Sequence, residues 1–310
     1  MECKWKILSI FVEIKNGKVI NNTRKIADKM IKYDKEIKEE KMKVKFYDFS
    51  LLKKYINILS VINLLFTSVL IFFDIPQKNK VPSFIVFIIV NIIIYLIMLV
   101  QANKMSKLKL EVDGSTVEIR EGNIFEEENL KVINFNEYFD TKVDNNVIAE
   151  NTLNGQFIKK YVDNIEELDM LIEEKLECIE YNDNRKNGKK KKYSLGEIIE
   201  YKDFLITSLS KFDDNNRANL TLKEYIGFLM NFWNNLDVIY ANRNVSMTIF
   251  GSGITRFKDI TYISEQELLE IMIWSFKISK VKFKYPTKVS IIIPKEKINK
   301  INLYKIKEEF

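Results

Sequence analysis

Two adjacent runs of uncharged, apolar residues, 56–73 and 84–100, constrain this chain more than any other feature. Each run approaches the roughly 20 residues that a helix needs to cross the hydrocarbon core of a bilayer. Two of the chain's four prolines, Pro76 and Pro82, lie in the connector between the runs, where a helix must end and turn. The pattern predicts a two-helix transmembrane hairpin. The alternative is a helical hairpin buried in a soluble core, where two such runs rarely occur together.

The distribution of charge predicts how the hairpin is oriented. The net charge is +6, but the excess of lysine lies before residue 110, and residues 110–310 are mildly acidic. Basic flanks favour the cytoplasmic side of a membrane. We therefore expect a multi-pass membrane protein with both termini in the cytoplasm and a short connector outside. The basic flanks are Lys53, Lys54, Lys104, Lys107 and Lys109, and the connector carries the opposing Lys78 and Lys80.

Polar residues recur at helical spacing within both runs. Those of the first run lie on one helix face, and the two of the second run are four residues apart. Polar groups in hydrocarbon seek one another or water. Two interpretations follow: a hydrogen-bonded seam within the hairpin, or a polar face that meets neighbouring protomers or a water path. The polar face comprises Asn57, Ser60, Asn63, Thr67, Asn91 and Tyr95.

Composition excludes several kinds of chemistry. The chain contains no histidine, which removes histidine-based catalysis and histidine-ligated metals. Its two cysteines, Cys3 and Cys178, have neither metal-site spacing nor a disulfide signal. An acidic domain binds nucleic acid poorly. We therefore predict no metal and no nucleic-acid partner.

The chain divides into three predicted parts: a basic extension of residues 1–45, the hairpin region of residues 46–109, and a cytoplasmic domain of residues 110–310. The sequence pattern of the extension is compatible with several structures. It fits an amphipathic helix on the membrane surface, a weak β-hairpin, or a segment that precedes the true start of translation at Met42.

After residue 109 the pattern changes to short strands that alternate with helices. Two capping boxes, Thr221 to Glu224 and Ser264 to Glu267, predict helices 221–240 and 264–276, and Asn164 caps a third helix, 164–179. A run of basic residues, 185–192, predicts a solvated loop, with contact to anionic lipid as the alternative. This alternation indicates an α/β sandwich with a mixed sheet. The predicted strands are 115–120, 130–135, 198–201, 204–209, 247–250, 281–285 and 289–293.

Glycine is scarce, so the position of each glycine is informative. The chain has nine glycines, and Gly122, Gly251 and Gly253 follow predicted strands. Loops at the carboxyl ends of strands are where open α/β sheets bind ligands. Residues 250–256, Phe-Gly-Ser-Gly-Ile-Thr-Arg, can form a turn whose backbone N–H groups converge on a phosphate. An ordinary turn is the alternative.

A set of longer motifs resembles the macro domain, the ADP-ribose-binding α/β/α module. The motifs are VINFNEYFDT, LNGQF, SKFDDNNRANLTLKEYI and FGSGITRF, in that order. More narrowly, residues 46–310 resemble the macro-domain effectors of type II Thoeris antiphage systems, which place a membrane hairpin before the macro domain. The resemblance implies a macro-domain-like three-layer α/β/α sandwich with a mixed sheet, preceded by the two-helix transmembrane hairpin.

The resemblance also implies a binding site for ADP-ribose. Asn123, in the place of the aspartate that accepts from the adenine amino group, would make that contact without charge. Asn136 falls near the asparagine that faces the distal ribose, and the first loop, 142–157, keeps only Gly155. Arg217 and Arg256 are candidates for a phosphate or carboxylate clamp, with a salt bridge as the alternative. The predicted ligand-binding residues are Gly122, Asn123, Ile124, Phe125, Asn136, Asp140, Asn154, Gly155, Arg217, Gly251, Ser252, Gly253, Ile254, Thr255 and Arg256.

The function that the resemblance implies is that of a non-enzymatic effector in the bacterial inner membrane. It would need no cofactor and no catalytic residue. Its ligand would be an ADP-ribose conjugate, such as the histidine conjugate, made from NAD by a TIR-domain partner. Binding would favour a homo-oligomer whose hairpins disrupt the lipid bilayer and stop growth of the infected cell. The alternatives are a passive membrane-anchored binding module and an ADP-ribosyl hydrolase whose water is held by Asn136 or Asp140.

Overall fold

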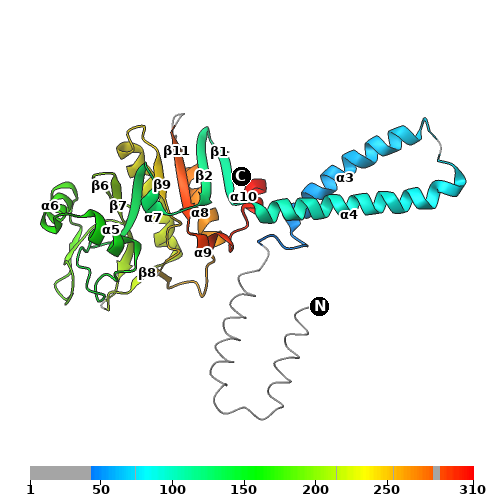
Figure 1. Ribbon diagram of the computed structural model, residues 1–310. Helices are drawn as coiled ribbons and strands as arrows, with labels where there is room; N and C mark the ends of the chain where they lie inside the picture. The colour runs from blue at the N-terminus through cyan, green and yellow to red at the C-terminus, as the bar shows by residue number, and fades with distance from the viewer. Residues whose placement is uncertain (1–42, 74, 214, 254, 282–286) are drawn as a thin grey trace, which may run out of the picture. The chain divides into compact units, whose positions relative to one another are not determined.

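A computed structural model describes Lys43–Phe310 with the exception of residues 74, 214, 254 and 282–286 (Figure 1). The three interpretations of the N-terminal extension therefore lie outside the described residues. So do most of the strand predicted at 281–285 and one predicted site residue, Ile254.

Two long helices form the predicted hairpin. Helix α3 spans Phe49–Leu70 and α4 spans Lys80–Lys104, with the short 3₁₀ helix η1, Gln77–Asn79, before α4. Helix α3 begins before the apolar run because the Asp48 side chain accepts a hydrogen bond from the Leu51 N–H, 3.2 Å away. Both helices are long and apolar enough to cross a membrane.

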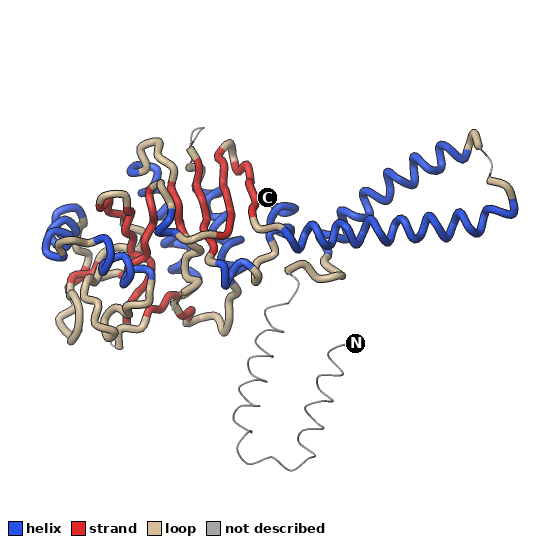
Figure 2. The backbone as a smooth tube through the Cα atoms, in the orientation of Figure 1, coloured by secondary structure: helices blue, strands red, loops and turns tan. Residues whose placement is uncertain are grey.

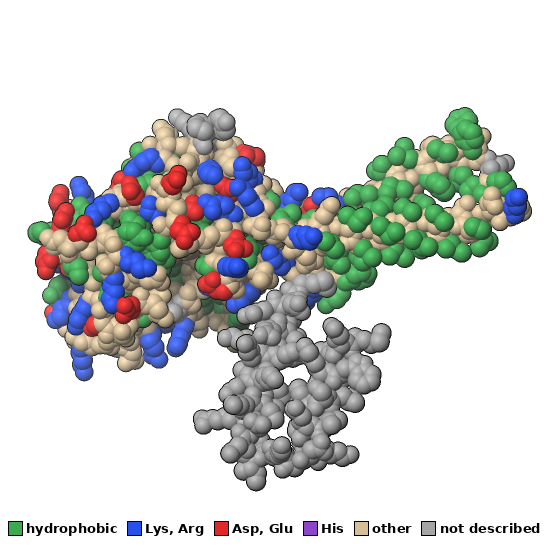
Figure 3. Space-filling model, in the orientation of Figure 1, with side chains coloured by type: hydrophobic (Ala, Val, Ile, Leu, Met, Phe, Trp, Pro, Cys, Tyr) green, Lys and Arg blue, Asp and Glu red, His purple; other side chains and the backbone are tan. Residues whose placement is uncertain are grey.

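The surface of these helices argues against the buried-hairpin alternative. Only 6% of the most apolar window of α3 and 17% of that of α4 is buried. Large apolar side chains of these helices, such as Leu64 and Ile92, are exposed. Figure 3 shows apolar side chains along the length of both helices. Such a continuous apolar surface indicates a membrane or another apolar partner.

The polar residues of the hairpin do not form a continuous seam. The hydroxyls of Ser60 and Thr67 each donate to a backbone carbonyl four residues earlier in their own helix, at 2.8 Å. The two helices are joined instead near their base, where the Tyr55 hydroxyl donates to the Asn91 carbonyl at 3.3 Å. The hydroxyl of Tyr95 donates to the Phe46 carbonyl. The outer half of the polar face thus makes no bond between α3 and α4 among the described residues.

The remainder of the chain is built on a nine-stranded mixed sheet (Figure 2). Its order is β1-β2-β11-β9-β3-β7-β8-β10, with β6 also paired to β7. Strands β2, β11, β9, β3 and β7 are parallel, so their carboxyl ends meet at one edge. The strands are β1 (Lys107–Val112), β2 (Ser115–Glu121), β3 (Leu130–Asn136), β6 (Ile198–Tyr201), β7 (Phe204–Phe212), β8 (Ala218–Leu220), β9 (Val245–Met247), β10 (Arg256–Phe257) and β11 (Lys288–Ile293).

Helices cover both faces of the sheet, which confirms the predicted three-layer sandwich. One face packs against α5 (Leu153–Tyr161) and α6 (Ile165–Lys175), and the other against α7 (Leu222–Ile239) and α8 (Glu265–Ser279). Neighbouring strand residues such as Val132 and Ile133 enter different cores because side chains alternate across a strand. Both predicted capping boxes are present.

Some predicted boundaries differ from the structure. Helix α6 ends at Lys175 because Leu176 is extended, and the chain then enters a separate two-stranded sheet, β4 (Glu180–Tyr181) with β5 (Lys191–Lys192). The strand predicted at 247–250 is β9, Val245–Met247.

Strand β1 was not predicted. Lys107 and Lys109, interpreted as a membrane flank, alternate with the buried side chains of Leu108 and Leu110 in a strand that crosses the predicted boundary at residue 110. Lys107 forms an ion pair with Glu118, a buried residue of β2. Burial raises the pKa of Glu118, but hydrogen bonds and charges from Lys107 and Lys288 outweigh it and lower the pKa to about 2.

The C-terminal segment contacts the base of the hairpin. Two short helices, α9 (Lys295–Ile298) and α10 (Leu303–Glu309), follow β11. The Asn302 amide donates to Asp48 at 3.0 Å, and Lys54 pairs with Glu308 at 3.0 Å. Tyr304 packs in one apolar cluster with side chains of α3 and α4. This junction, residues 302–308 against the base of the hairpin, joins the sandwich to the two helices.

Candidate functional site

A cavity of about 370 Å³ opens at the edge where the parallel strands end. It follows the sheet order from β11, past β9 and β3, to β7 and β8. This is the position at which open α/β sheets bind ligands. Its lining residues are Asn134, Phe135, Asn136, Asn151, Thr152, Leu153, Asn154, Leu209, Ser210, Phe212, Ala218, Thr248, Ile249, Gly251, Ser252, Gly253, Thr255, Pro294 and Lys297.

The glycine loop, residues 251–255, lines part of this cavity through its described residues Gly251, Ser252, Gly253 and Thr255. Gly251 has a φ of +78°, which a side chain would strain, and the preceding Phe250 carbonyl accepts the hydroxyl of buried Tyr225 at 3.0 Å. The Ser252 hydroxyl donates to the Ile249 carbonyl at 2.8 Å. Among the described residues the backbone N–H groups of Gly251 and Gly253 have no acceptor within the chain. A tight loop with free N–H groups is suited to an anion.

Lys297, which no sequence pattern predicted as a site residue, brings a positive charge close to this loop. Its ammonium donates to the Ser252 carbonyl and lies 3.4 Å from the Ser252 hydroxyl. It also pairs with Glu265, at the start of α8, at 3.0 Å. Lys297 and Ser252 are 45 residues apart, so no local pattern could have linked them.

Asn136, at the end of β3, lines another part of the same cavity. The pairing of β3 with β7 shifts register between Phe135 and Asn136, where β7 carries one extra residue, Leu209, which also lines the cavity. A tight turn follows, in which Phe139 has a φ of +47°. Such a conformation costs a bulky residue about 1–3 kcal/mol, and complete burial of the Phe139 ring offsets it.

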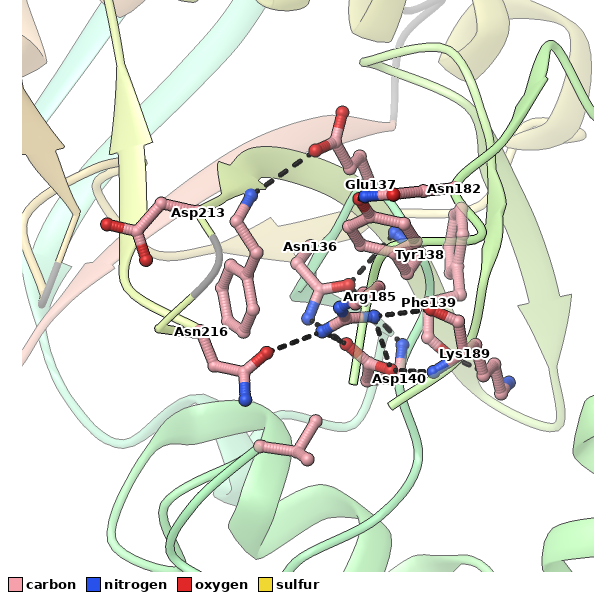
Figure 4. Close-up of polar contacts among 12 residues, drawn as sticks. Asn136, Glu137, Tyr138, Phe139, Asp140, Asn182, Arg185, Lys189, Asp213 and Asn216 are labelled. Carbon is pink, nitrogen blue, oxygen red and sulfur yellow. Dashed lines mark hydrogen bonds and ion pairs between the residues drawn. The ribbon is translucent and has the colours of Figure 1, made fainter. Parts of the chain in front are cut away.

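Asp140, a predicted site residue, contacts Asn136 (Figure 4) but is absent from the cavity lining. Its carboxylate accepts the Asn136 amide at 2.9 Å and the guanidinium of Arg185 at 2.7 and 3.1 Å. The backbone N–H of Lys189 donates to it at 2.8 Å. Asp140 is buried and does not line the cavity, whereas Asn136 does, so Asp140 is a partner of Asn136 and not a ligand contact.

The basic run 185–192 is therefore not simply a solvated loop. Arg185 is 6% exposed and its guanidinium stacks 3.8 Å from the centre of the Tyr138 ring. Burial lowers the pKa of Lys189, an effect that its ion pair with Asp169 opposes. Charge composition predicted exposure here because the acidic partners lie in distant segments.

The predicted adenine residues lie outside the described lining of the cavity. The Asn123 side chain accepts the Phe125 N–H at 3.2 Å and donates to Glu126 at 3.0 Å, capping the 3₁₀ helix η2, Ile124–Glu126. Ile124 is buried, and the Phe125 ring stacks on another aromatic ring 5.3 Å away. Gly122 approaches its neighbours closely, since an added Cβ would lie 3.1 Å from Nη1 of the Arg120 side chain.

The remaining predicted residues separate into two groups. Asn154, Gly251, Ser252, Gly253 and Thr255 line the cavity together with Asn136. Gly155 does not; it allows the start of α5 to pack, because an added Cβ would lie 2.3 Å from the Ala149 carbonyl oxygen.

The two predicted arginines also lie outside the cavity lining. Arg217 pairs with Asp213 at 2.8 Å and its side chain is 56% exposed, which favours the salt-bridge alternative. Arg256 is exposed on strand β10.

One further polar residue, Asn134, lines the cavity. Its side-chain oxygen is buried and has no hydrogen-bond partner among the described residues, an exception to the usual pairing of buried polar atoms. No group of three metal-binding side chains occurs within the described part of the chain. The cavity thus offers N–H donors and an ammonium on one side and uncharged amides on the other.

Comparison with known proteins agrees with this architecture. Residues 117–294 match the family model described as Thoeris protein ThsA, Macro domain. A Thoeris protein ThsA from Bacillus amyloliquefaciens (strain Y2) is 42% identical over 244 residues, which cover 76% of this chain and 82% of that protein.

Solved structures provide a more distant comparison. An Oceanobacillus iheyensis macrodomain with MES bound has a TM-score of 0.40 and 16% identity over 66% of this chain and 99% of its own. The same macrodomain with ADP has a TM-score of 0.38 and 13% identity, over 65% and 95%. These scores are low, and the fold assignment rests on the sheet, its two helical layers and the family match.

Proposed function

Because this chain belongs to the Thoeris protein ThsA family, whose macro domain it matches over residues 117–294, we propose that it is an antiphage effector that senses an ADP-ribose conjugate. The conjugate, such as histidine linked to ADP-ribose, would be made from NAD by a TIR-domain partner. The protein would bind it on the cytoplasmic side of the bacterial inner membrane.

The cavity is the observation that carries this proposal. A cavity of about 370 Å³ accommodates a dinucleotide-sized ligand in part, and its two sides suit different groups. The free N–H groups of the glycine loop and the ammonium of Lys297 suit a pyrophosphate. The Asn136 amide suits ribose hydroxyls, which both donate and accept hydrogen bonds.

Binding without turnover is favoured over hydrolysis. Asp140, the carboxylate closest to Asn136, is held by Arg185 and by the Lys189 N–H, and it does not line the cavity. A carboxylate so engaged is a poor base for activating water, since its lone pairs already accept hydrogen bonds. No catalytic residue is assigned.

A continuous set of contacts supports communication with the hairpin. Lys297 joins the glycine loop to α8, and the Gln266 side chain of α8 accepts the Asn302 N–H at 2.8 Å. Asn302 in turn contacts Asp48, the cap of α3. A ligand acts through such contacts only if it binds the assembled, membrane-active state more tightly than the resting state. We propose that binding favours a homo-oligomer whose hairpins disrupt the bilayer and arrest the infected cell.

Two measurements on the full-length chain test the proposal. Calorimetry in lipid nanodiscs should detect binding of ADP-ribose and tighter binding of its histidine conjugate. Dye release from liposomes that contain the protein should then increase when the same ligand is added. Binding without dye release would favour the passive anchored module, and turnover of the conjugate would favour the hydrolase.

A further inference from the structure

Arg185 and Asp140 form an ion pair that is buried beside the cavity (Figure 4). Their side chains are 4% and 1% exposed, and the closest approach is 2.7 Å. Two guanidinium nitrogens reach two carboxylate oxygens, so the pair is bidentate. Arg185 comes from the segment between β4 and β5, far from Asp140 in sequence.

Stability alone does not account for this pair. Removing two charges from water costs several kcal/mol per ion, and their attraction often only balances that cost. The Arg185 Nε is buried and has no hydrogen-bond partner among the described residues, which adds to the cost. We therefore expect that this buried pair fixes a conformation.

The conformation that it fixes is that of the Asn136 amide. The Asn136 oxygen accepts the Tyr138 N–H at 2.9 Å, and its nitrogen donates to Asp140 at 2.9 Å. In the reversed orientation the amide nitrogen would face the Tyr138 N–H, and the amide oxygen would face the Asp140 carboxylate. A donor would then face a donor and an acceptor an acceptor, so only the observed orientation makes both hydrogen bonds. One N–H of the amide makes no bond among the described residues, and Asn136, although only 1% exposed, lines the cavity.

The same pair ties together the segments that enclose this side of the cavity. Arg185 donates to the Lys189 carbonyl at 2.6 Å and to the Asn216 side chain at 2.9 Å. Asn216 lies in the turn between β7 and β8, whose residues Phe212 and Ala218 line the cavity. Gly188 has a φ of +88°, and an added Cβ would lie 2.6 Å from the Asp140 carboxylate, so the loop wraps the pair closely.

We infer that the Arg185–Asp140 pair is a positioning element that orients Asn136 and thereby gives the site its preference for ligands with a ribose beyond the pyrophosphate. This inference rests on the proposed function, because it assumes that phosphates occupy the glycine-loop side. Asn136 contacts the ligand, and Arg185 acts on the ligand only through Asp140 and Asn136. Bare ADP, which lacks the second ribose, would not use this contact.

Calorimetry of the full-length chain in nanodiscs with ADP and with ADP-ribose tests the inference. Arg185→Met should weaken ADP-ribose binding by roughly tenfold, the scale of one hydrogen bond, and change ADP binding by less than about twofold. Arg185→Lys keeps the charge but loses the two-nitrogen fork of the guanidinium. It should therefore change the ratio of ADP-ribose to ADP affinity less than Arg185→Met does. Arg243→Met is the control, since Arg243 makes a bidentate pair with Glu200 that lies away from the cavity lining.

A double variant separates positioning from a general structural role. In an Asn136→Ala background, Arg185→Met should cause no further change in the ratio of ADP-ribose to ADP affinity. An equal loss of both ligands in Arg185→Met, or a further change of the ratio in the double variant, would overturn the inference. If the wild-type chain binds neither ligand, the proposed function itself fails. If it binds both ligands and Arg185→Met leaves the ratio of their affinities unchanged, the inference fails and the proposed function stands. Should Arg185→Met unfold in thermal scans, Arg185→Lys and its double variant decide the question.

Discussion

Gly253→Glu should abolish ligand binding without unfolding the protein. An added Cβ at Gly253 meets no heavy atom within 4 Å, and the residue belongs to the glycine loop that lines the cavity, so the side chain fits and its carboxylate is within reach of the cavity. A carboxylate about 4 Å from a phosphate charge costs roughly 4 kcal/mol at an effective dielectric constant near 20. That energy corresponds to a loss of affinity of roughly a thousandfold.

Two control variants separate charge from bulk. Gly253→Gln has the same length without the charge, and Gly227→Glu adds the same charge on the exposed face of α7, where an added Cβ also meets nothing. In calorimetry with ADP-ribose, Gly227→Glu should bind as the wild type does, and Gly253→Gln should lose far less affinity than Gly253→Glu. The difference in affinity between Gly253→Gln and Gly253→Glu should shrink at about 1 M salt, where charges are screened within about 3 Å.

Equal affinities for Gly253→Glu and Gly253→Gln would refute the argument, because a phosphate beside residue 253 must respond to the charge. A Gly253→Glu chain with wild-type affinity would show that the anion binds elsewhere. Thermal unfolding of each variant checks that the substitutions leave the fold intact.

Three further outcomes are expected. Glu118, with its lowered pKa of about 2, should contribute up to about 3 kcal/mol of stability, which is complete above pH 4.5 and is lost as the pH falls toward 2. Denaturation at several pH values should show this loss in the wild type and not in Glu118→Gln. Gly155→Ala should destabilise the domain by about 1–3 kcal/mol in urea denaturation because the added methyl group clashes with the backbone, whereas Gly227→Ala should stabilise it by up to about 1 kcal/mol. Equal stabilities of the two variants would contradict the packing assigned to Gly155. Replacing Asn63 and Thr67 together by leucine should preserve membrane insertion and reduce ligand-triggered dye release, and unchanged release would mean that the polar face takes no part in it.

The parts of this molecule that could be predicted from sequence are those that local patterns determine. The capping boxes at Thr221 and Ser264 found α7 and α8 because their partners lie three residues away. The glycine loop was found because it follows a predicted strand, and parallel strands bring their carboxyl ends together. Asn136 was found from the resemblance to macro domains, and it lines the same cavity. Strand β1 was missed although its alternation was present, since lysines beside an apolar run also predict a membrane flank.

The remainder of the site depends on contacts between distant segments. Arg185 and Lys297 each lie 45 residues from the partner that explains them, Asp140 and Ser252. Before the fold is known, each is one lysine or arginine among 49. Their roles follow only from burial and from the alignment of several loops at one sheet edge.

The junction between the hairpin and the C-terminal segment has a consequence for the synthesis of the protein. Lys54 and Glu308 are 254 residues apart, so at about 5–20 residues per second a ribosome needs roughly 13–50 seconds to make the second after the first. Under the proposed function, the hairpin would enter the membrane during this interval, before the contacts that would restrain it exist. Under the proposed function, cells survive each round of translation only if the hairpin alone is harmless, which normal growth during expression of residues 43–109 would support. Toxicity would then require residues beyond 109, and translation that stops at the end of the hairpin would leave an inert membrane segment and not an unregulated toxin.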